Sequence, residues 1–122
     1  MKINIKSTSI TLTPEITDYL DKKLESLTKF IDPNDSAVKI DVELGKTTRH
    51  HQAGDIFRAE INIFAPKKTF RSETEATDLF SAIDELKDEI LNELSSNKRR
   101  SLHFIRKGGQ KIKNLMKGLG GW

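Results

Sequence analysis

The chain contains three histidines and no cysteine, so the histidines are the first candidates for metal binding. His50 and His51 are adjacent in a polar stretch, and His103 lies far from them in the sequence. Adjacent histidines do not chelate a metal as a helical i, i+4 pair does, and no third ligand follows at metal-binding spacing. We interpret the pair as part of a solvated loop, with RNA contact as the functional alternative, and we predict no metal site.

Motifs for covalent catalysis or phosphate cradling are also absent from the sequence. No serine lies in a Gly-x-Ser-x-Gly turn, and no glycine-rich loop connects an expected strand to an expected helix. The 18 acidic residues look like surface charge, and no isolated pair sits in apolar surroundings that would tune one carboxyl as an acid. The sequence therefore predicts no catalytic residue, no cofactor and no small-molecule substrate.

Basic residues are concentrated at the end of the chain. Residues 98–122 contain eight of the 21 Lys and Arg and none of the 18 Asp and Glu, so residues 1–97 have a net charge of −5. Dispersed cations favour a polyanion, because each phosphate that they neutralise releases counterions. His103, Phe104 and Trp122 add rings that stack on unpaired bases. The segment predicts a nucleic-acid partner.

The same segment also permits a membrane interpretation. One helical face would carry apolar residues opposite the lysines, as at an anionic bilayer surface: Ile112, Leu115, Met116 and Leu119. Its glycines make such a helix marginal in water, so we rank this alternative second. The N-terminus has no apolar signal-peptide region, and no apolar stretch is long enough to span a bilayer. Together with the lack of cysteine, these features favour the cytoplasm.

Periodic patterns predict the elements that position these groups. Period-two alternation predicts strands at residues 2–7, 37–45, 56–65 and 69–74. Thr13-Pro14-Glu15 is typical of a helix start, and Asp32-Pro33-Asn34-Asp35 is typical of a turn that ends the helix. The apolar stripe of this first helix is Ile16, Leu20, Leu24, Leu27 and Ile31. A second helix is expected at about 76–96, with Ser72 and Thr74 as capping residues and a stripe of Leu79, Ile83, Leu86, Ile90 and Leu94.

This β-α-β-β-β-α order predicts an α+β fold. We expect a four-stranded mixed sheet with two helices packed on one face and the other face in water. The first two strands should be parallel neighbours, and the remaining pairs should be hairpins. The domain should cover residues 1–97, followed by a basic, flexible C-terminal tail at 98–122.

Certain strings resemble the ribosome hibernation promoting factors, the family of the ribosome-associated inhibitor, ribosomal subunit interface proteins and sigma-54 modulation proteins. They are MKINI at the start, TPEITDYLDKKLESLTKF at 13–30 and DLFSAIDEL at 78–86. The likeness covers residues 1–97. It implies the fold predicted above, which is also similar to double-stranded-RNA-binding domains.

The resemblance further implies a non-enzymatic inhibitor of translation. Family members bind the small ribosomal subunit and its rRNA in the tRNA and mRNA channel, and they preserve idle ribosomes during stress or starvation. A general RNA-binding module or RNA chaperone without ribosome specificity is the alternative. Long members carry a second domain that pairs ribosomes, so this chain is similar to short members. Any role in ribosome dimers through other factors is left open.

The candidate rRNA-binding residues come from three sources. The resemblance transfers Lys23 and Lys29 on the first helix, and a helical wheel adds Lys22 on the edge that carries Lys29, although an ordinary solvated helix face is the alternative. Loop positions and the tail supply the rest: Arg49, His50, Lys67, Lys68, Lys98, Arg99, Arg100, Arg106 and Lys107. The second helix departs from the family pattern, because Glu89, Asn92 and Ser96 replace basic residues beside Glu85 and Glu93.

Overall fold

The order of elements in the computed structural model is β-α-β-β-β-α, as predicted. The structure describes residues 1–47 and 54–107, with the backbone alone beyond residue 97. Its elements are β1 (Lys2–Thr8), α1 (Pro14–Leu24), the 3₁₀ helix η1 (Glu25–Lys29), β2 (Lys39–Thr47), β3 (Ile56–Phe64), β4 (Thr69–Ala76) and α2 (Leu79–Lys107). The chain forms two compact units, Met1–Leu91 and Asn92–Trp122, and α2 begins in the first and belongs to the second from Asn92 onward.

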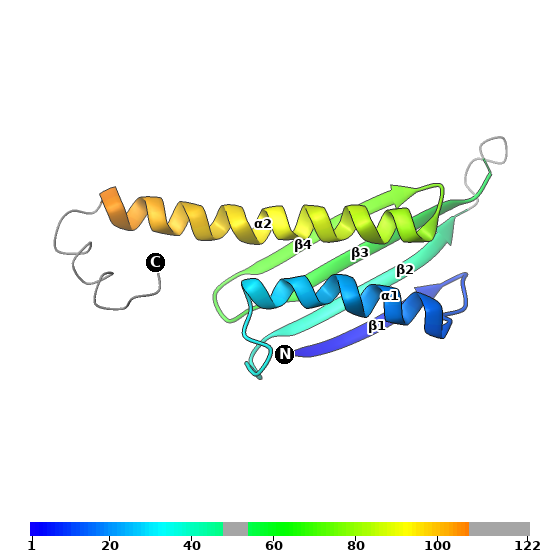
Figure 1. Cartoon of the computed structure of the whole chain (residues 1–122), viewed down its shortest axis with the longest axis horizontal. Helices are drawn as coiled ribbons and strands as arrows, with labels where there is room; N and C mark the ends of the chain where they lie inside the picture. Colours follow the sequence, from blue (N-terminus) through cyan, green and yellow to red (C-terminus); the bar gives the residue numbers. More distant parts are fainter. Residues whose placement is uncertain (48–53, 108–122) are drawn as a thin grey trace. The chain divides into compact units, whose positions relative to one another are not determined.

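The four strands of the first unit form one sheet in the order β1-β2-β3-β4 (Figure 1). β1 pairs with β2 in parallel, from Lys2 opposite Lys39 to Thr8 opposite Gly45. The β2–β3 and β3–β4 pairs are antiparallel. Two parallel strands need a crossover connection, and α1 provides it between β1 and β2. The predicted mixed sheet is confirmed.

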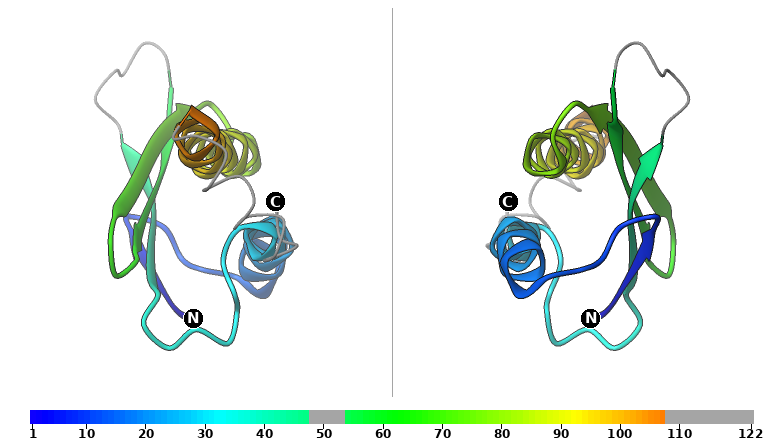
Figure 2. Two further views of the ribbon diagram at one scale, coloured as in Figure 1. Left: turned by 90° about the vertical axis from the view of Figure 1, so that its left-hand side faces the viewer. Right: turned by 90° about the vertical axis from the view of Figure 1, so that its right-hand side faces the viewer.

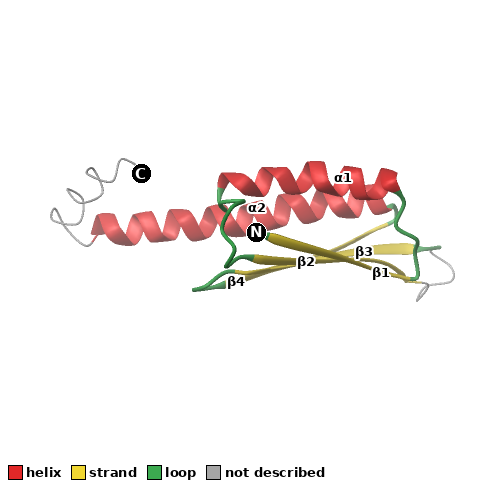
Figure 3. Cartoon of the chain, turned by 90° about the horizontal axis from the view of Figure 1, so that it is seen from below, coloured by secondary structure: helices red, strands yellow, loops and turns green. Residues whose placement is uncertain are grey.

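Both helices of the first unit cover the same face of the sheet. The end-on views and the view from below show α1 and the first part of α2 side by side on one side of the strands (Figures 2 and 3). The core lies between the sheet and these helices. There, every second residue of a strand packs against the apolar stripes of the helices. Among the best buried side chains are Leu20, Leu27, Ile40, Leu44, Ile61, Ile63, Ile83, Leu86 and Ile90. Full burial of each contributes about 1.5–3 kcal/mol before conformational entropy is counted.

The helix boundaries correct the prediction in two places. The expected first helix ends as an α-helix at Leu24, and its last turns tighten into η1. The second helix begins later than expected, because the chain remains in β4 up to Ala76. It extends eleven residues beyond residue 96, to Lys107, the last residue that the structure describes.

The predicted caps of the second helix are wrong. Ser72 and Thr74 are buried residues of β4 whose side chains lie on the core side. The Thr74 hydroxyl donates to the carbonyl oxygen of Ala82 over 2.8 Å. Asp78 provides the cap instead, since its Oδ2 accepts from the Ser81 backbone N–H over 3.0 Å.

Candidate nucleic-acid interface

The basic residues of α1 lie in its last turn because of where the helix starts. Thr13 caps the helix by accepting the Ile16 backbone N–H on Oγ1 over 3.3 Å, and Pro14 follows at the first helical position. Lys22 and Lys23 then fall in the last turn, where the helix dipole favours positive charge. Lys22 is exposed, whereas Lys23 is half-buried towards α2.

Lys23 belongs to a polar cluster that links α1 to α2. Its Nζ lies 3.1 Å from Oδ1 of Asp84, and the Tyr19 hydroxyl donates to the same oxygen over 2.6 Å. The Lys23 ammonium also lies 5.1 Å from the centre of the Tyr19 ring. The edge-to-face contact of Tyr19 with Phe80, at 4.9 Å between ring centres, fixes the ring. We call Tyr19, Lys23, Phe80 and Asp84 the helix clasp.

The charges of the helix clasp shift one another's protonation equilibria. The hydrogen bond from Tyr19 lowers the pKa of Asp84, and the ammonium of Lys23 lowers it further. The same hydrogen bond raises the pKa of Tyr19, because losing the phenolic proton beside a carboxylate is unfavourable. Asp84 also raises the pKa of Lys23. At neutral pH the clasp therefore contains a carboxylate, an ammonium and a neutral phenol.

The groove between the two helices is filled by side chains and leaves no pocket for a ligand. Only about 10 Å³ of free volume remains between the apolar side chains of α1, η1, α2 and β3. Lys23 and Lys87 lie among the residues that line it, one from each helix. Lys87 forms an ion pair with the adjacent Asp88 at 3.3 Å. A small molecule has no space here, whereas a polyanion could contact both lysines from outside.

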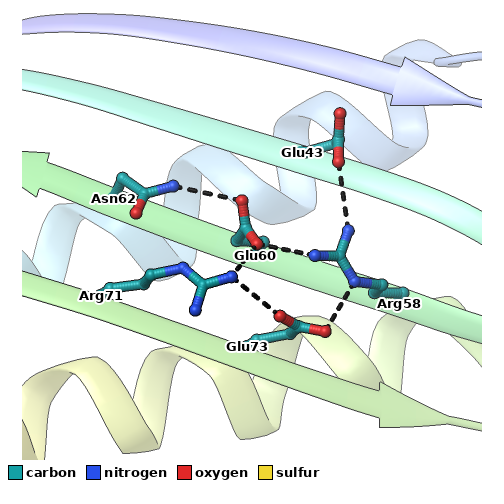
Figure 4. A network of polar contacts seen from close by, with 6 residues as sticks. All are labelled: Glu43, Arg58, Glu60, Asn62, Arg71 and Glu73. Carbon is teal, nitrogen blue, oxygen red and sulfur yellow. Dashed lines mark hydrogen bonds and ion pairs between the residues drawn. The ribbon is translucent and has the colours of Figure 1, made fainter.

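The opposite face of the sheet carries an ionic network (Figure 4). Strand register places Glu43, Glu60 and Glu73 directly opposite one another on β2, β3 and β4. Like charges in such positions repel. Arg58 offsets this repulsion by contacting all three carboxylates, at 3.1, 2.6 and 2.8 Å respectively. Arg71 contacts Glu60 at 2.7 Å and Glu73 at 3.0 Å.

This network neutralises the arginines of the outer sheet face. The hydrogen bond to Glu73 raises the pKa of Arg58, and Arg58 in turn lowers the pKa of Glu73. An open hollow of about 510 Å³ lies on the same face, over β1, β2 and β3. Its walls mix both charges with two amides: Asn4, Ile5, Lys6, Lys39, Asp41, Val42, Glu43, Glu60 and Asn62. Such a surface does not attract phosphates as a basic groove does.

The predicted RNA-binding residues of the first unit that the structure describes lie on α1, on η1 and in the β3–β4 turn. Lys29 is exposed at the end of η1. Lys67 and Lys68 are exposed in the β3–β4 turn, and the Lys68 ammonium lies 5.2 Å from the Phe70 ring centre. Hairpin topology puts this turn at the opposite end of β3 from the connection between β2 and β3. Arg49 and His50 belong to that connection and lie outside the described residues.

The predicted residues of the basic tail begin on a helix. The backbone of α2 includes Lys98, Arg99, Arg100, Arg106 and Lys107, whose side chains are outside the described part of the structure. Nearer its start, α2 is acidic at the surface, because Glu85 and Glu89 are exposed there. Across α1, η1 and α2 as far as Leu91, four lysines stand against eight carboxylates.

Sequence analysis missed Asp84 and Lys87 as members of this surface. The spacing of the aromatic and charged residues in the sequence could have indicated the contact between the two helices. Tyr19 and Lys23 are four residues apart on one helix, and Phe80 and Asp84 are four apart on the other, so each pair shares a helical face. Both pairs flank the buried stripes, which places them where the helices meet.

The described part of the chain has neither a metal-binding cluster nor a membrane-spanning helix. Residues 1–47 and 54–97, whose side chains are described, contain no group of three or more acidic or histidine side chains arranged to hold a metal ion. Within the same ranges, no helix has the length and hydropathy of a transmembrane span.

Similarity to known proteins agrees with the resemblance in the sequence. A profile of the family described as sigma 54 modulation protein / S30EA ribosomal protein matches residues 3–101. The ribosome hibernation promotion factor of Picosynechococcus sp. is 30% identical over 101 residues, which are 83% of this chain and 51% of that protein. The chain thus spans about half the length of that relative. The ribosome hibernation promoting factor of Acinetobacter guillouiae is 26% identical over 107 residues, covering 85% of this chain and 93% of that protein.

Solved structures share the fold. The N-terminal domain of Thermus thermophilus Protein Y is 28% identical, with a TM-score of 0.63, and the match covers 77% of this chain and 96% of that one. A ribosomal subunit interface protein from Coxiella burnetii has a TM-score of 0.64 at 19% identity, covering 81% and 99%. The second likeness shows the fold alone. On the strength of the profile match, this chain belongs to the sigma 54 modulation protein / S30EA ribosomal protein family.

Proposed function

We propose that this protein binds the small ribosomal subunit in the channel used by tRNA and mRNA, and that it inhibits translation without catalysing a reaction. By doing so in the cytoplasm, it keeps ribosomes in hibernation under stress or starvation. Family membership supports this proposal, as do two relatives named for ribosome hibernation.

The division of charge is the observation that carries the mechanism. The helices of the first unit have twice as many carboxylates as lysines, and both arginines of the outer sheet face are paired with glutamates. Long-range attraction to phosphate therefore comes mainly from residues 98–122, with their eight cations. In this proposal the domain at 1–97 supplies the shape that fits the channel, and the basic segment at 98–122 supplies the charge.

Competition with tRNA on purified small subunits tests the proposal. Full-length protein should displace bound tRNA, and excess tRNA should displace the protein, because the two would occupy one channel. A general RNA-binding module would instead bind the subunit and an unrelated structured RNA of the same length with similar affinity. Simultaneous binding of tRNA and protein at saturation would reject the channel as the binding site.

A further inference from the structure

Among the three lysines of α1 and η1, Lys23 is the one that forms an ion pair with Asp84. The Lys23 ammonium lies between the Asp84 carboxylate, at 3.1 Å, and the Tyr19 ring, at 5.1 Å from its centre. Within residues 1–47 and 54–97, neither Lys22 nor Lys29 has an ion-pair partner, and both are exposed. A phosphate that reaches Lys22 or Lys29 displaces water, whereas one that reaches Lys23 meets a carboxylate beside the ammonium.

This arrangement restricts the directions in which the Lys23 ammonium can donate further hydrogen bonds. An ammonium has three N–H donors, so Lys23 keeps donors for a phosphate while one is directed to Asp84. Those donors point in directions set by the clasp, because Asp84 is itself held by the Tyr19 hydroxyl at 2.6 Å and the Tyr19 ring contacts Phe80. A flexible RNA gains little from such a site and is repelled by the carboxylate.

We propose that Asp84 is a specificity-determining residue of the RNA-binding surface. It restrains Lys23 and weakens binding to unstructured RNA more than binding to the small ribosomal subunit, whose phosphates are fixed in space. Asp84 touches no RNA in this proposal and acts through Lys23, so it is a positioning residue. The inference rests on the proposed function, since it assigns Lys23 to the surface that faces rRNA.

Asp84→Asn is the primary test, and Asp21→Asn is its matched control. Both substitutions remove one negative charge from the helical layer, but Asp21 on α1 is exposed and has no ion-pair partner within residues 1–47 and 54–97. Full-length variants would be titrated against polyuridylate and against purified small subunits at several salt concentrations. Asp84→Asn should bind polyuridylate about threefold more tightly than Asp21→Asn, with a salt slope steeper by about one, as one additional phosphate contact implies.

Affinity for the small subunit should stay unchanged or fall in Asp84→Asn, so the ratio of the two affinities should decrease. Asp84→Glu, which retains the charge, should restore the ratio in part. In a Lys23→Gln background, Asp84→Asn should lose its excess effect over Asp21→Asn, because no ammonium is left to release. Equal effects of Asp84→Asn and Asp21→Asn on both RNAs would show that only net charge matters and would overturn the proposal.

Lys23→Gln provides a second route should Asp84→Asn fail to fold. This variant should lose more affinity for the small subunit than for polyuridylate, whereas Lys22→Gln should weaken both by similar factors. Equal losses for the two lysine variants would reject a special role for Lys23. Failure of the wild type to bind small subunits would refute the proposed function instead, and the polyuridylate comparison would still decide whether Asp84 restrains Lys23.

Discussion

Tyr19 and Asp84, separated by 65 residues in the sequence, are joined by a hydrogen bond of 2.6 Å that connects α1 to α2. Tyr19 is the one tyrosine of the chain, so its ionisation reports on this contact alone. The carboxylate accepts the phenolic proton and raises the pKa of Tyr19 above its ordinary value of 10.0. The helix clasp can therefore be measured directly in solution.

Asp84→Asn should lower the pKa of Tyr19 towards its ordinary value, because an amide removes the negative charge that opposes ionisation. Tyrosinate absorbance in an alkaline titration measures this change. The raised pKa means that the clasp stabilises the fold below the unfolded pKa, and that this stability is lost as pH rises through the folded value. Asp88→Asn should leave the Tyr19 titration where it is, and an unchanged titration in Asp84→Asn would contradict the hydrogen bond.

Arg58→Met should lower the free energy of unfolding by about 1–2 kcal/mol, because it leaves three opposed glutamates without their shared cation. Chemical unfolding at neutral pH measures the loss. Arg71→Met is the matched control, since Arg71 has 58% of its side chain exposed and contacts two of the three carboxylates, against 27% exposure for Arg58. Its effect should be smaller. Added salt should stabilise Arg58→Met relative to the wild type, because it screens the glutamate row.

Stability should decrease on acidification. Asp84 and Glu73 both have pKa values below their ordinary 3.8 and 4.5, the first because of Tyr19 and Lys23 and the second because of Arg58. Their contribution is fully present above the unfolded values and is lost as pH falls through the lowered folded values. Unfolding free energies between pH 7 and 2 measure this loss. Arg58→Met should show a shallower acid dependence, and an equal slope in both proteins would argue against the Arg58–Glu73 pair.

Removing three cations from the tail should flatten the salt dependence of ribosome binding. The triple variant Lys98→Gln, Arg99→Gln, Arg100→Gln should reduce the slope of log affinity against log salt by up to about three. Its control removes three exposed cations from the outer sheet face, Lys2→Gln, Lys6→Gln and Lys39→Gln, and should leave the slope nearly unchanged. Equal slopes for the two triple variants would remove positions 98–100 from the electrostatic mechanism.

Liposome flotation separates RNA binding from the membrane alternative. If the basic tail acts on RNA, full-length protein should stay at the bottom of the gradient with neutral vesicles. With anionic vesicles at physiological salt it should be released by added polyuridylate, because one set of cations serves both polyanions. Stable flotation with anionic vesicles in the presence of excess RNA would favour the membrane interpretation.

The strands and their order could be predicted because period-two alternation depends on local residues. Ile40 and Val42 on β2, and Ile61 and Ile63 on β3, alternate with polar residues and are buried as expected. Helix limits were harder, since they depend on contacts with distant residues. Thr74 resembled a cap at the end of an alternating run, but its hydroxyl faces the core and bonds to Ala82.

Ionic contacts between distant segments could not be predicted from composition. The outward charges of β2, β3 and β4 were visible in the sequence, but strand register decides that Glu43, Glu60 and Glu73 meet in one row. The same holds for Lys23, which was predicted as an RNA-binding residue from the family resemblance. Its position on the first helix gives no indication that Asp84 on α2 shares its ammonium.

Hydroxyl-radical footprinting of rRNA on purified small subunits tests the central claim most directly. With full-length protein, we expect protection of backbone positions that line the tRNA and mRNA channel. Without residues 98–122, the same central positions should be protected at higher protein concentration and lower salt, because the domain still fits the channel but has lost most of its attraction. Protection confined to the outer surface of the subunit, or no protection in dilute buffer, would contradict the account.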